Sequence, residues 1–411
     1  MRKLALRDEI LLSIEKPARY IGNEVNAVMK SRDVDIRFAM CFPDVYEIGM
    51  SHLGIQILYD MFNKREDTWC ERVYSPWTDL DAVMHKEHIP LFALESQDPI
   101  KDFDFLGITI QYEMCYTNIL QILDLSGIPM MAVDRTWDDP IVIGGGPCAY
   151  NPEPLADFFD IFYIGEGEVV YDELLELFKK AKKECWSREE FLHQASHIAG
   201  IYVPSLYKVS YHEDGTIAAF EPVYDDVPKT VEKQIVMDVT NASYPKTPVV
   251  PFIKCTQDRV VLEIQRGCIR GCRFCQAGMI YRPTRERDLE MLKEYAYAML
   301  KSTGHEEISL SSLSSSDYSD LAGIVNFLID EFEKTGVNIS LPSLRIDAFS
   351  LDVMSKVQDI KKSSLTFAPE AGSQRLRISS RSCPCWTCWS CRSPRTSCRW
   401  SARTGFWPIS A

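Results

Sequence analysis

The sequence predicts an α/β protein in which a doubly wound parallel sheet is followed by a second, shorter series of strand–helix units. Short apolar runs alternate with helical segments from about residue 35 onward, which is typical of parallel strands that are buried on both faces. A further apolar strand at 259–264 ends directly in a loop with three cysteines. At 411 residues the chain is too long for one ordinary core, so we expect more than one domain.

The composition is that of a globular protein, with 46% hydrophobic and 25% charged residues. No run of 18 apolar residues occurs, and the first residues lack the apolar core of a signal peptide. We therefore expect a cytoplasmic, thiol-reducing location and no membrane association. The net charge of −14 argues against sequence-independent nucleic-acid binding, which relies on Lys and Arg. RNA stays open as a substrate, because a local basic patch would suffice.

The first 185 residues are expected to contain a lead-in and one domain. Residues 1–35 should form a helical lead-in that Pro17 interrupts. Residues 36–185 should form a doubly wound sheet of flavodoxin-like size. The apolar runs predict strands at 36–41, 105–110, 141–144 and 158–164, with helices between them that include 54–62 and 116–126.

The turn after the first predicted strand carries Asp44, Tyr46 and Gly49, and a helix entry with His52 follows. This turn resembles the DxHxxG turn of cobalamin-binding domains, whose histidine is the lower axial ligand of cobalt. Tyr46 stands in the place of that histidine, and a phenol with a pKa near ~10 is a poor ligand at neutral pH. The resemblance therefore implies a cofactor-facing turn without the histidine-ligated mode. His52 is either a corrin contact or an ordinary residue on a helix surface.

Two later turns also resemble turns of the cobalamin-binding module. Gly144 and Gly145 follow one predicted strand, and Gly165 follows the next. Glycines at the carboxyl ends of strands let the backbone approach a flat or phosphate-bearing ligand. The alternative is that they form ordinary tight turns in a Rossmann-like sheet. Cobalamin is accordingly a candidate cofactor.

Residues 186–250 are expected to connect the two domains. Two predicted strands at 200–210 and 217–223 flank the turn His212-Glu213-Asp214-Gly215, which indicates a hairpin. Prolines at 245, 248 and 251 then mark the boundary before the next domain.

The three cysteines Cys268, Cys272 and Cys275 have the spacing CxxxCxxC. Three thiolates leave one iron of a four-iron cube without a protein ligand, free to bind and activate a small molecule. The spacing, the preceding glycine and the aromatic residue before the third cysteine resemble the radical S-adenosylmethionine (SAM) enzymes. Zinc is the main alternative, but a zinc site needs four closed ligands, and no histidine follows until His305.

The resemblance implies a [4Fe-4S] cluster held by the three cysteines, SAM as the second cofactor, and an electron donor such as flavodoxin or ferredoxin. It implies a partial β/α barrel, here incomplete, over residues 251–377, with the backbone around Phe274 against the adenine of SAM. The resemblance also implies further SAM contacts on later strands, which are Ser343, Arg345 and Glu370. Arginines 266, 270 and 273 would give the loop a positive charge that favours the thiolates. Arg282 and Arg285 are candidates for the SAM carboxylate or for substrate, or else surface residues.

The last 34 residues break with this pattern. No acidic residue follows Glu370, and five of the 14 cysteines fall in 378–411, which shows neither strand alternation nor a helical stripe. We expect a truncated or frame-shifted sequence after about residue 377 and an aberrant disordered tail. The alternative is that the tail cysteines bind a second cluster.

Taken together, residues 36–377 resemble an uncharacterised branch of cobalamin-domain radical SAM proteins. The resemblance implies an enzyme that reductively cleaves SAM to a 5′-deoxyadenosyl radical, with cobalamin-assisted methyl or related group transfer as one form of the reaction. The sequence identifies no substrate. Two other functions stay open: a non-catalytic fragment that only binds a cluster, and a zinc-binding interaction protein.

Overall fold

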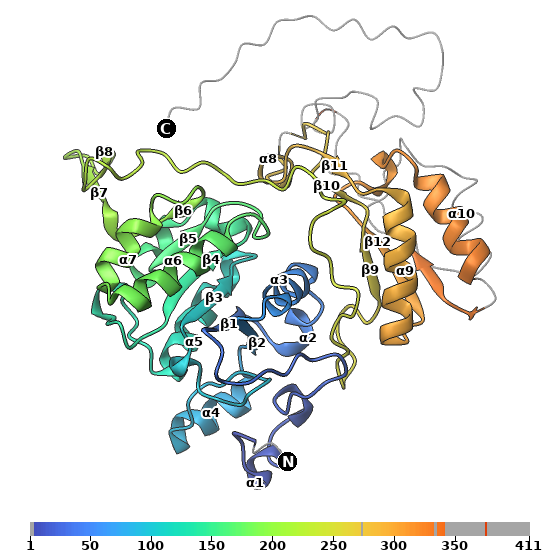
Figure 1. The fold of residues 1–411 in the computed structure, drawn as a ribbon, viewed down its shortest axis with the longest axis horizontal. Coiled ribbons are helices and arrows are strands. Elements are labelled where there is room, and N and C mark those ends of the chain that lie inside the picture. Colours follow the sequence, from blue (N-terminus) through green and yellow to red (C-terminus); the bar gives the residue numbers. More distant parts are fainter. Residues whose placement is uncertain (1–3, 273, 333–334, 342–374, 376–411) are drawn as a thin grey trace, which may run out of the picture.

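The computed structural model describes residues 4–272, 274–332, 335–341 and Arg375, which form two α/β units joined by a long connector (Figure 1). The N-terminal unit is built on a six-stranded sheet with the order β2-β1-β3-β4-β5-β6. Its first five strands are parallel, and the last is an antiparallel edge strand. The strands are β1 (Ile36–Phe42), β2 (Thr68–Tyr74), β3 (Phe105–Thr109), β4 (Ile141–Gly145), β5 (Ile161–Tyr163) and β6 (Ile201–Tyr202).

Helices cover both faces of this sheet, because successive residues of each strand point to opposite sides. In β1, Phe38 and Met40 enter the core beneath one set of helices, while Ala39 and Cys41 enter the core on the other face. The first set comprises α3 (Leu53–Lys64), α6 (Tyr171–Glu184) and α7 (Arg188–Ala195), and the second comprises α4 (Thr78–Glu87) and α5 (Tyr116–Ser126). The predicted strands at 36–41, 105–110 and 141–144 and both predicted helices match observed elements.

Strand β2 was not predicted, because charged Glu71 and Arg72 interrupt its apolar run. Both side chains are buried and paired: Arg72 contacts Glu24 at 2.8 Å and Glu95 at 2.6 Å, and Glu71 contacts Arg37 at 2.6 Å. Because each of these charges is neutralised by its partner, the strand can contain Glu71 and Arg72 and still be buried along its whole length.

The lead-in differs from the helical segment that we expected. Among its described residues it contains only the single turn α1 (Asp8–Leu11) and a short 3-10 turn at Pro17–Arg19. Leu6, Ile10 and Ile14 still pack into the core on the α4–α5 face. The short helix α2 (Tyr46–Gly49) follows β1. The lead-in therefore contributes packing with little regular structure.

The C-terminal unit contains a parallel sheet with the order β13-β12-β9 in its described part. The strands are β9 (Val260–Glu263), β12 (Glu307–Ser311) and β13 (Asn338–Ser340), and helices α9 (Leu289–Thr303) and α10 (Leu321–Phe332) pack on them. A separate two-stranded ribbon pairs β10 (Gln265–Arg266) with β11 (Arg285–Glu286), and the single turn α8 (Ala277–Ile280) lies in the loop between them. The predicted strand at 364–373 and the tail at 378–411 lie outside the described residues.

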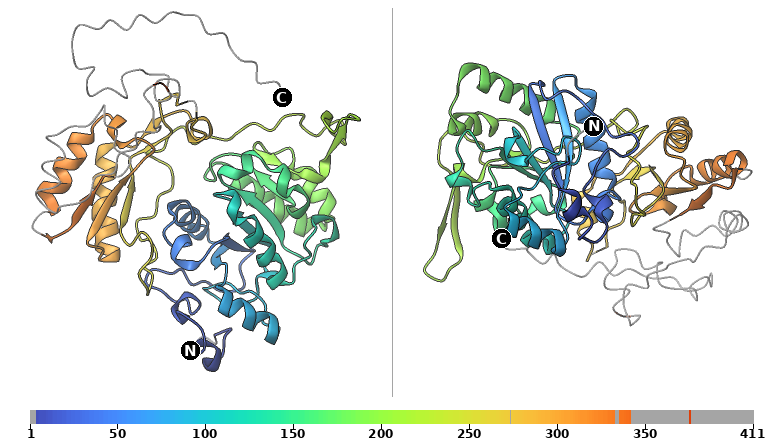
Figure 2. Two further views of the ribbon diagram at one scale, coloured as in Figure 1. Left: turned by 180° about the vertical axis from the view of Figure 1, so that it is seen from behind. Right: turned by 90° about the horizontal axis from the view of Figure 1, so that it is seen from below.

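The connector contains the predicted hairpin, formed by β7 (Tyr207–Tyr211) and β8 (Ile217–Pro222), and then runs without regular structure to β9. The two units lie side by side, with α3 between their sheets (Figures 1 and 2). Ile55 and Tyr59 of α3 belong to the core of the N-terminal unit, whereas Ile57 belongs to the core of the C-terminal unit. In the part of the chain that the structure describes, no helix is long and apolar enough to cross a membrane.

Candidate functional site

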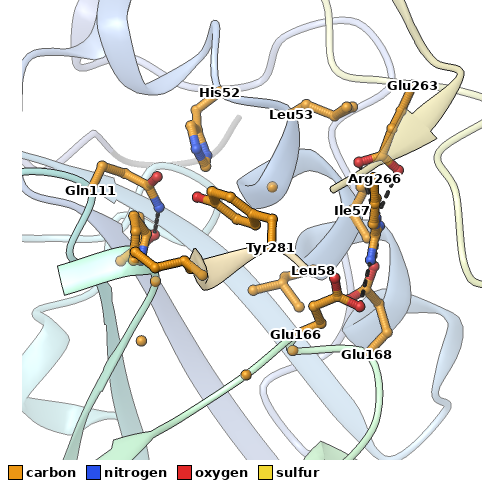
Figure 3. Close-up of a pocket in the computed structure, with 18 of the residues that line it drawn as sticks. His52, Leu53, Ile57, Leu58, Gln111, Glu166, Glu168, Glu263, Arg266 and Tyr281 are labelled. Carbon is orange, nitrogen blue, oxygen red and sulfur yellow. Dashed lines mark hydrogen bonds and ion pairs between the residues drawn. The ribbon is translucent and has the colours of Figure 1, made fainter. Parts of the chain in front are cut away.

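A cavity of about 480 Å³ lies between the two units (Figure 3). The carboxyl ends of parallel strands from both sheets face it, which is where open α/β sheets and β/α barrels bind their ligands. The N-terminal unit contributes Thr109, Gly145 and the segment Gly165–Glu168, and the C-terminal unit contributes residues from the ends of β9 and β12, such as Glu263 and Ser311. A ligand in this cavity would contact both units.

The loop that contains the three cysteines reaches this cavity with its two ends, and the cysteines themselves are not among the lining residues. Residues 267–284 connect β10 to β11, and Gly267, Ile280, Tyr281 and Arg282 line the cavity wall. Cys268, Cys272 and Cys275 are all partly exposed, and the Cys275 N–H donates to the Cys272 carbonyl at 3.0 Å. Phe274 is 56% exposed.

The donor set fits a cluster with one open iron, since a single loop supplies three accessible thiols and no fourth. The sulfur atoms do not converge: within the described residues, no three Cys, His, Asp or Glu side chains are placed to hold a metal ion. Three cysteines in one loop are therefore the donor set of a cluster. In the described part of the chain these cysteines do not belong to a closed four-ligand zinc site.

The arginines around the loop are neutralised, in contrast to the positive charge that we expected. Arg266 pairs with Glu263 at 3.0 Å and with Glu168 at 2.6 Å, and Arg270 Nε donates to Asp317 at 2.9 Å. Arg273 lies outside the described residues. The loop thus gains little net charge from Arg266 and Arg270.

Gly267 is required by the geometry of the loop entry. Its φ is +79°, and a Cβ there would lie 2.6 Å from the carbonyl oxygens of Tyr281 and Pro283. These oxygens belong to the returning end of the loop, so the two ends of the loop pass in direct backbone contact.

We expect Gly267→Ala to reduce stability by at least about 2 kcal/mol, because a left-handed residue and a backbone clash are both introduced. Gly304→Ala is the matched control, since its φ is +70° but nothing lies within 4 Å of the added Cβ. That variant should lose only about 1 kcal/mol. Urea unfolding of both variants tests the difference, and equal losses would show that the contact at Gly267 has no effect.

Only part of the predicted cofactor-facing set lines the cavity. Gly145 and Gly165 do, and a Cβ added at Gly145 would have nothing within 4 Å. Gly144 instead packs under Phe162, and Gly49 packs against the Tyr74 ring. Neither of these two lines the cavity, so their small size serves internal packing. A Cβ added at Gly165 would lie 2.4 Å from the backbone of Gln234 in the connector.

The turn that contains Asp44 and Tyr46 does not line the cavity either. The Tyr46 side chain is 1% exposed, and its hydroxyl donates to Glu24 at 2.9 Å. Asp44 accepts a hydrogen bond from the Tyr112 hydroxyl. Ser343, Arg345 and Glu370 lie outside the described residues.

His52 lines the cavity, and Figure 3 shows it pointing toward Gln111 and Tyr281. Its Nδ1 accepts from the Ile55 N–H at 3.3 Å as the cap of α3, which places the proton of the neutral ring on Nε2. Burial lowers the pKa of His52 to about 4, against a hydrogen bond with Gln111 that raises it. The ring is therefore neutral at pH 7.

The sequence indicated neither Gln111 nor Tyr281. Gln111 donates to Thr109 Oγ1 at 2.6 Å, just beyond the end of β3, and Tyr281 follows the cysteine loop. The position of Gln111 after an apolar strand was the available signal. Arg285 was a candidate for the SAM carboxylate, but Glu166 binds it at 2.6 Å.

Two protein-family models match the chain. Residues 54–204 match the N-terminal domain of radical SAM proteins, and residues 262–384 match the radical SAM superfamily domain. An uncharacterized protein of Methanocaldococcus jannaschii is 31% identical over 342 residues, which cover 82% of this chain and 61% of that protein. The chain thus spans about three fifths of the length of this relative.

Two solved structures are similar to this chain at low sequence identity. One is the cobalamin-dependent SAM radical enzyme OxsB with aqua-cobalamin and SAM bound (14% identity, TM-score 0.48, 75% of this chain and 38% of that chain). The other is the radical SAM methyltransferase TsrM from Kitasatospora setae with tryptophan and a SAM analogue bound (13% identity, TM-score 0.44, 78% and 57%). One family model matches the N-terminal unit and the other matches the C-terminal unit with its cysteine loop, and together they confirm the predicted family: the chain belongs to the radical SAM superfamily.

Proposed function

We propose that this protein is a radical SAM enzyme whose reaction takes place in the cavity between the two units. The observation that supports the proposal is that both ends of the loop that contains the CxxxCxxC motif line a cavity where the carboxyl ends of two parallel sheets meet. Cys268, Cys272 and Cys275 would hold a [4Fe-4S] cluster. When bound, the cluster would supply an electron to the sulfonium of SAM, giving methionine and a 5′-deoxyadenosyl radical.

The lining of the cavity combines apolar side chains with neutral polar groups and charged groups. Leu58 and Val261 line it with apolar surface that limits the access of water. His52, Gln111 and Tyr281 offer neutral hydrogen-bonding groups that would orient a ligand without adding charge. The backbone around Phe274, which is exposed, remains the proposed contact for adenine.

Cobalamin is a second proposed cofactor, with methyl or related group transfer as the reaction that it would assist. The order of the parallel strands, β2-β1-β3-β4-β5, is that of flavodoxin-like sheets, which is the fold that we propose for residues 36–185. Gly145 leaves room at the cavity edge of this sheet, since a Cβ added there would have nothing within 4 Å. The buried Tyr46 would not ligate cobalt, since its hydroxyl is bound to Glu24. An electron donor such as flavodoxin or ferredoxin, in the cytoplasm, would complete the system.

Anaerobic reconstitution with iron and sulfide, reduction, and addition of SAM tests the proposal through the yield of 5′-deoxyadenosine. A parallel sample with hydroxocobalamin, desalted before its visible spectrum is recorded, tests the second cofactor. We expect about four irons per chain and formation of product. Iron without product would support the non-catalytic alternative, and zinc without iron would support the zinc-binding one. Loss of all corrin absorbance on desalting would contradict the cobalamin part alone.

A further inference from the structure

We propose that Glu166 and Glu168 of the N-terminal unit are positioning residues that hold the cysteine loop of the C-terminal unit closed at its base. That this loop holds a cluster rests on the proposed function, whereas the effect of the two glutamates on the shape of the loop does not. The loop 267–284 begins and ends at the ribbon formed by β10 and β11. The shape of this short ribbon therefore sets the distance between the two ends of the loop.

The base of the ribbon carries two like charges in direct opposition. Arg266 of β10 is paired in register with Arg285 of β11. Like charges directly opposite each other on neighbouring strands destabilise the pairing. Without a compensating group, this pair would drive the two ends of the loop apart.

Glu166 supplies the compensating charge from the other unit. Its carboxylate bonds Arg285 at 2.6 and 2.7 Å and lies 3.5 Å from Arg266. Burial alone would raise the pKa of Glu166, but the hydrogen bonds from Arg285 and the charge of Arg266 hold that pKa below its usual value. The carboxylate is therefore ionised at neutral pH, between the two arginines.

Glu168 completes a balanced network. It accepts from Arg266 at 2.6 Å, and Arg266 also bonds Glu263 (Figure 3). Glu263 in turn binds Arg287 at 2.9 Å. Three carboxylates thus face three guanidinium groups. Arg266 and Glu168 are about 90% buried, so solvent and salt screen these contacts little.

The connector holds the returning end of the same loop. Lys233 Nζ donates to the carbonyl oxygens of Ile280 and Arg282 at 2.9 and 2.8 Å. The Val236 N–H donates to Glu166 at 2.8 Å, which fixes the carboxylate itself. The closed form of the loop therefore depends on docking of the N-terminal unit, and a ligand that separates the units would also loosen the cysteine loop.

Hydrogen–deuterium exchange of the protein without a cluster tests the proposal. In Glu166→Gln and in Glu166→Gln/Glu168→Gln, amides in 267–284 should exchange about tenfold faster than in the wild type. The matched control is Glu176→Gln, which alters an exposed carboxylate of the same unit that pairs with Arg65 and Lys179. Its loop should exchange at the wild-type rate.

A second-site change separates positioning from general support of the fold. In Glu166→Gln/Arg285→Gln only Arg266 of the two opposed arginines remains, so their repulsion is gone and the loop should recover part of the protection that Glu166→Gln loses. Unchanged exchange in the Glu166 variants, faster exchange spread over the whole chain, or no recovery in this double variant would overturn the proposal. Because no cluster is present, failure of the wild type to bind iron would refute the proposed function and leave this result intact.

Discussion

Cys272→Ala is expected to abolish SAM cleavage, lowering 5′-deoxyadenosine by at least about 100-fold. Changes to groups that merely support metal ligands cost about 10–100-fold, and a direct ligand should cost more. With two cysteines left in the loop, two irons of a cube would lack a protein ligand. Iron content per chain and product formation, measured after the same anaerobic reconstitution, check this expectation.

Cys185→Ala is the matched control, because Cys185 is an exposed cysteine at the end of α6, outside the loop. It should keep the wild-type iron content and product yield. A Cys272→Ala protein with full activity would remove this residue from the proposed cluster site. Loss in both variants would point to general sensitivity to cysteine replacement and would equally contradict the assignment.

Arg72→Met is expected to lower the free energy of unfolding of the N-terminal unit by about 3–5 kcal/mol at pH 7. The variant would leave Glu24 and Glu95, both with fully buried side chains, without their shared partner. The loss should shrink in acid. Burial opposes ionisation of Glu24, but the charge and hydrogen bonds of Arg72 outweigh it and hold its pKa below 4.5. In the wild type, the stability gained from this lowered pKa is present above about pH 4.5 and is lost as the pH falls through the folded value.

Urea unfolding at pH 7 and at pH 4, followed by circular dichroism, measures this difference. Arg32→Met is the control, since Arg32 pairs with Asp98 with its own side chain 62% exposed. Exposed ion pairs contribute about 0–1 kcal/mol, so this variant should remain close to the wild type. If Arg72→Met unfolded at the wild-type urea concentration, the buried pairs would not stabilise the sheet.

The sequence predicts those elements that are determined by residues close together in the chain. Apolar runs predict β1, β3 and β4, and cysteine spacing predicts the loop after β9. Strand β2 escapes prediction because the charges of Glu71 and Arg72 are offset by residues far along the chain. Such pairings are a property of the folded state, and periodicity does not record them.

The candidate site shows the same division. The glycines at 144, 145 and 165 all look alike in the sequence, yet Gly144 is small because Phe162 packs on it, while Gly145 faces the cavity. Arg266 was expected to add positive charge at the cysteines, and Arg285 was a candidate for the SAM carboxylate or for substrate, but carboxylates from a turn about 100 residues earlier pair with both. Which polar group is left for a ligand depends on contacts between units, and a single sequence does not specify them.

Because α3 packs into the cores of both units, the N-terminal unit is expected to fold before the C-terminal unit. Because Ile57 fills part of the core of the C-terminal unit, that unit has no finished interior until a helix made some 200 residues earlier is in place. Chains generally fold from the N-terminus as they are synthesised, so the first unit is available as a template when β9 emerges. The C-terminal unit expressed by itself would present the apolar surface that α3 covers, and would bind other copies or aggregate. The two units therefore need to be parts of one polypeptide for the second unit to fold, apart from any role of both units in the reaction.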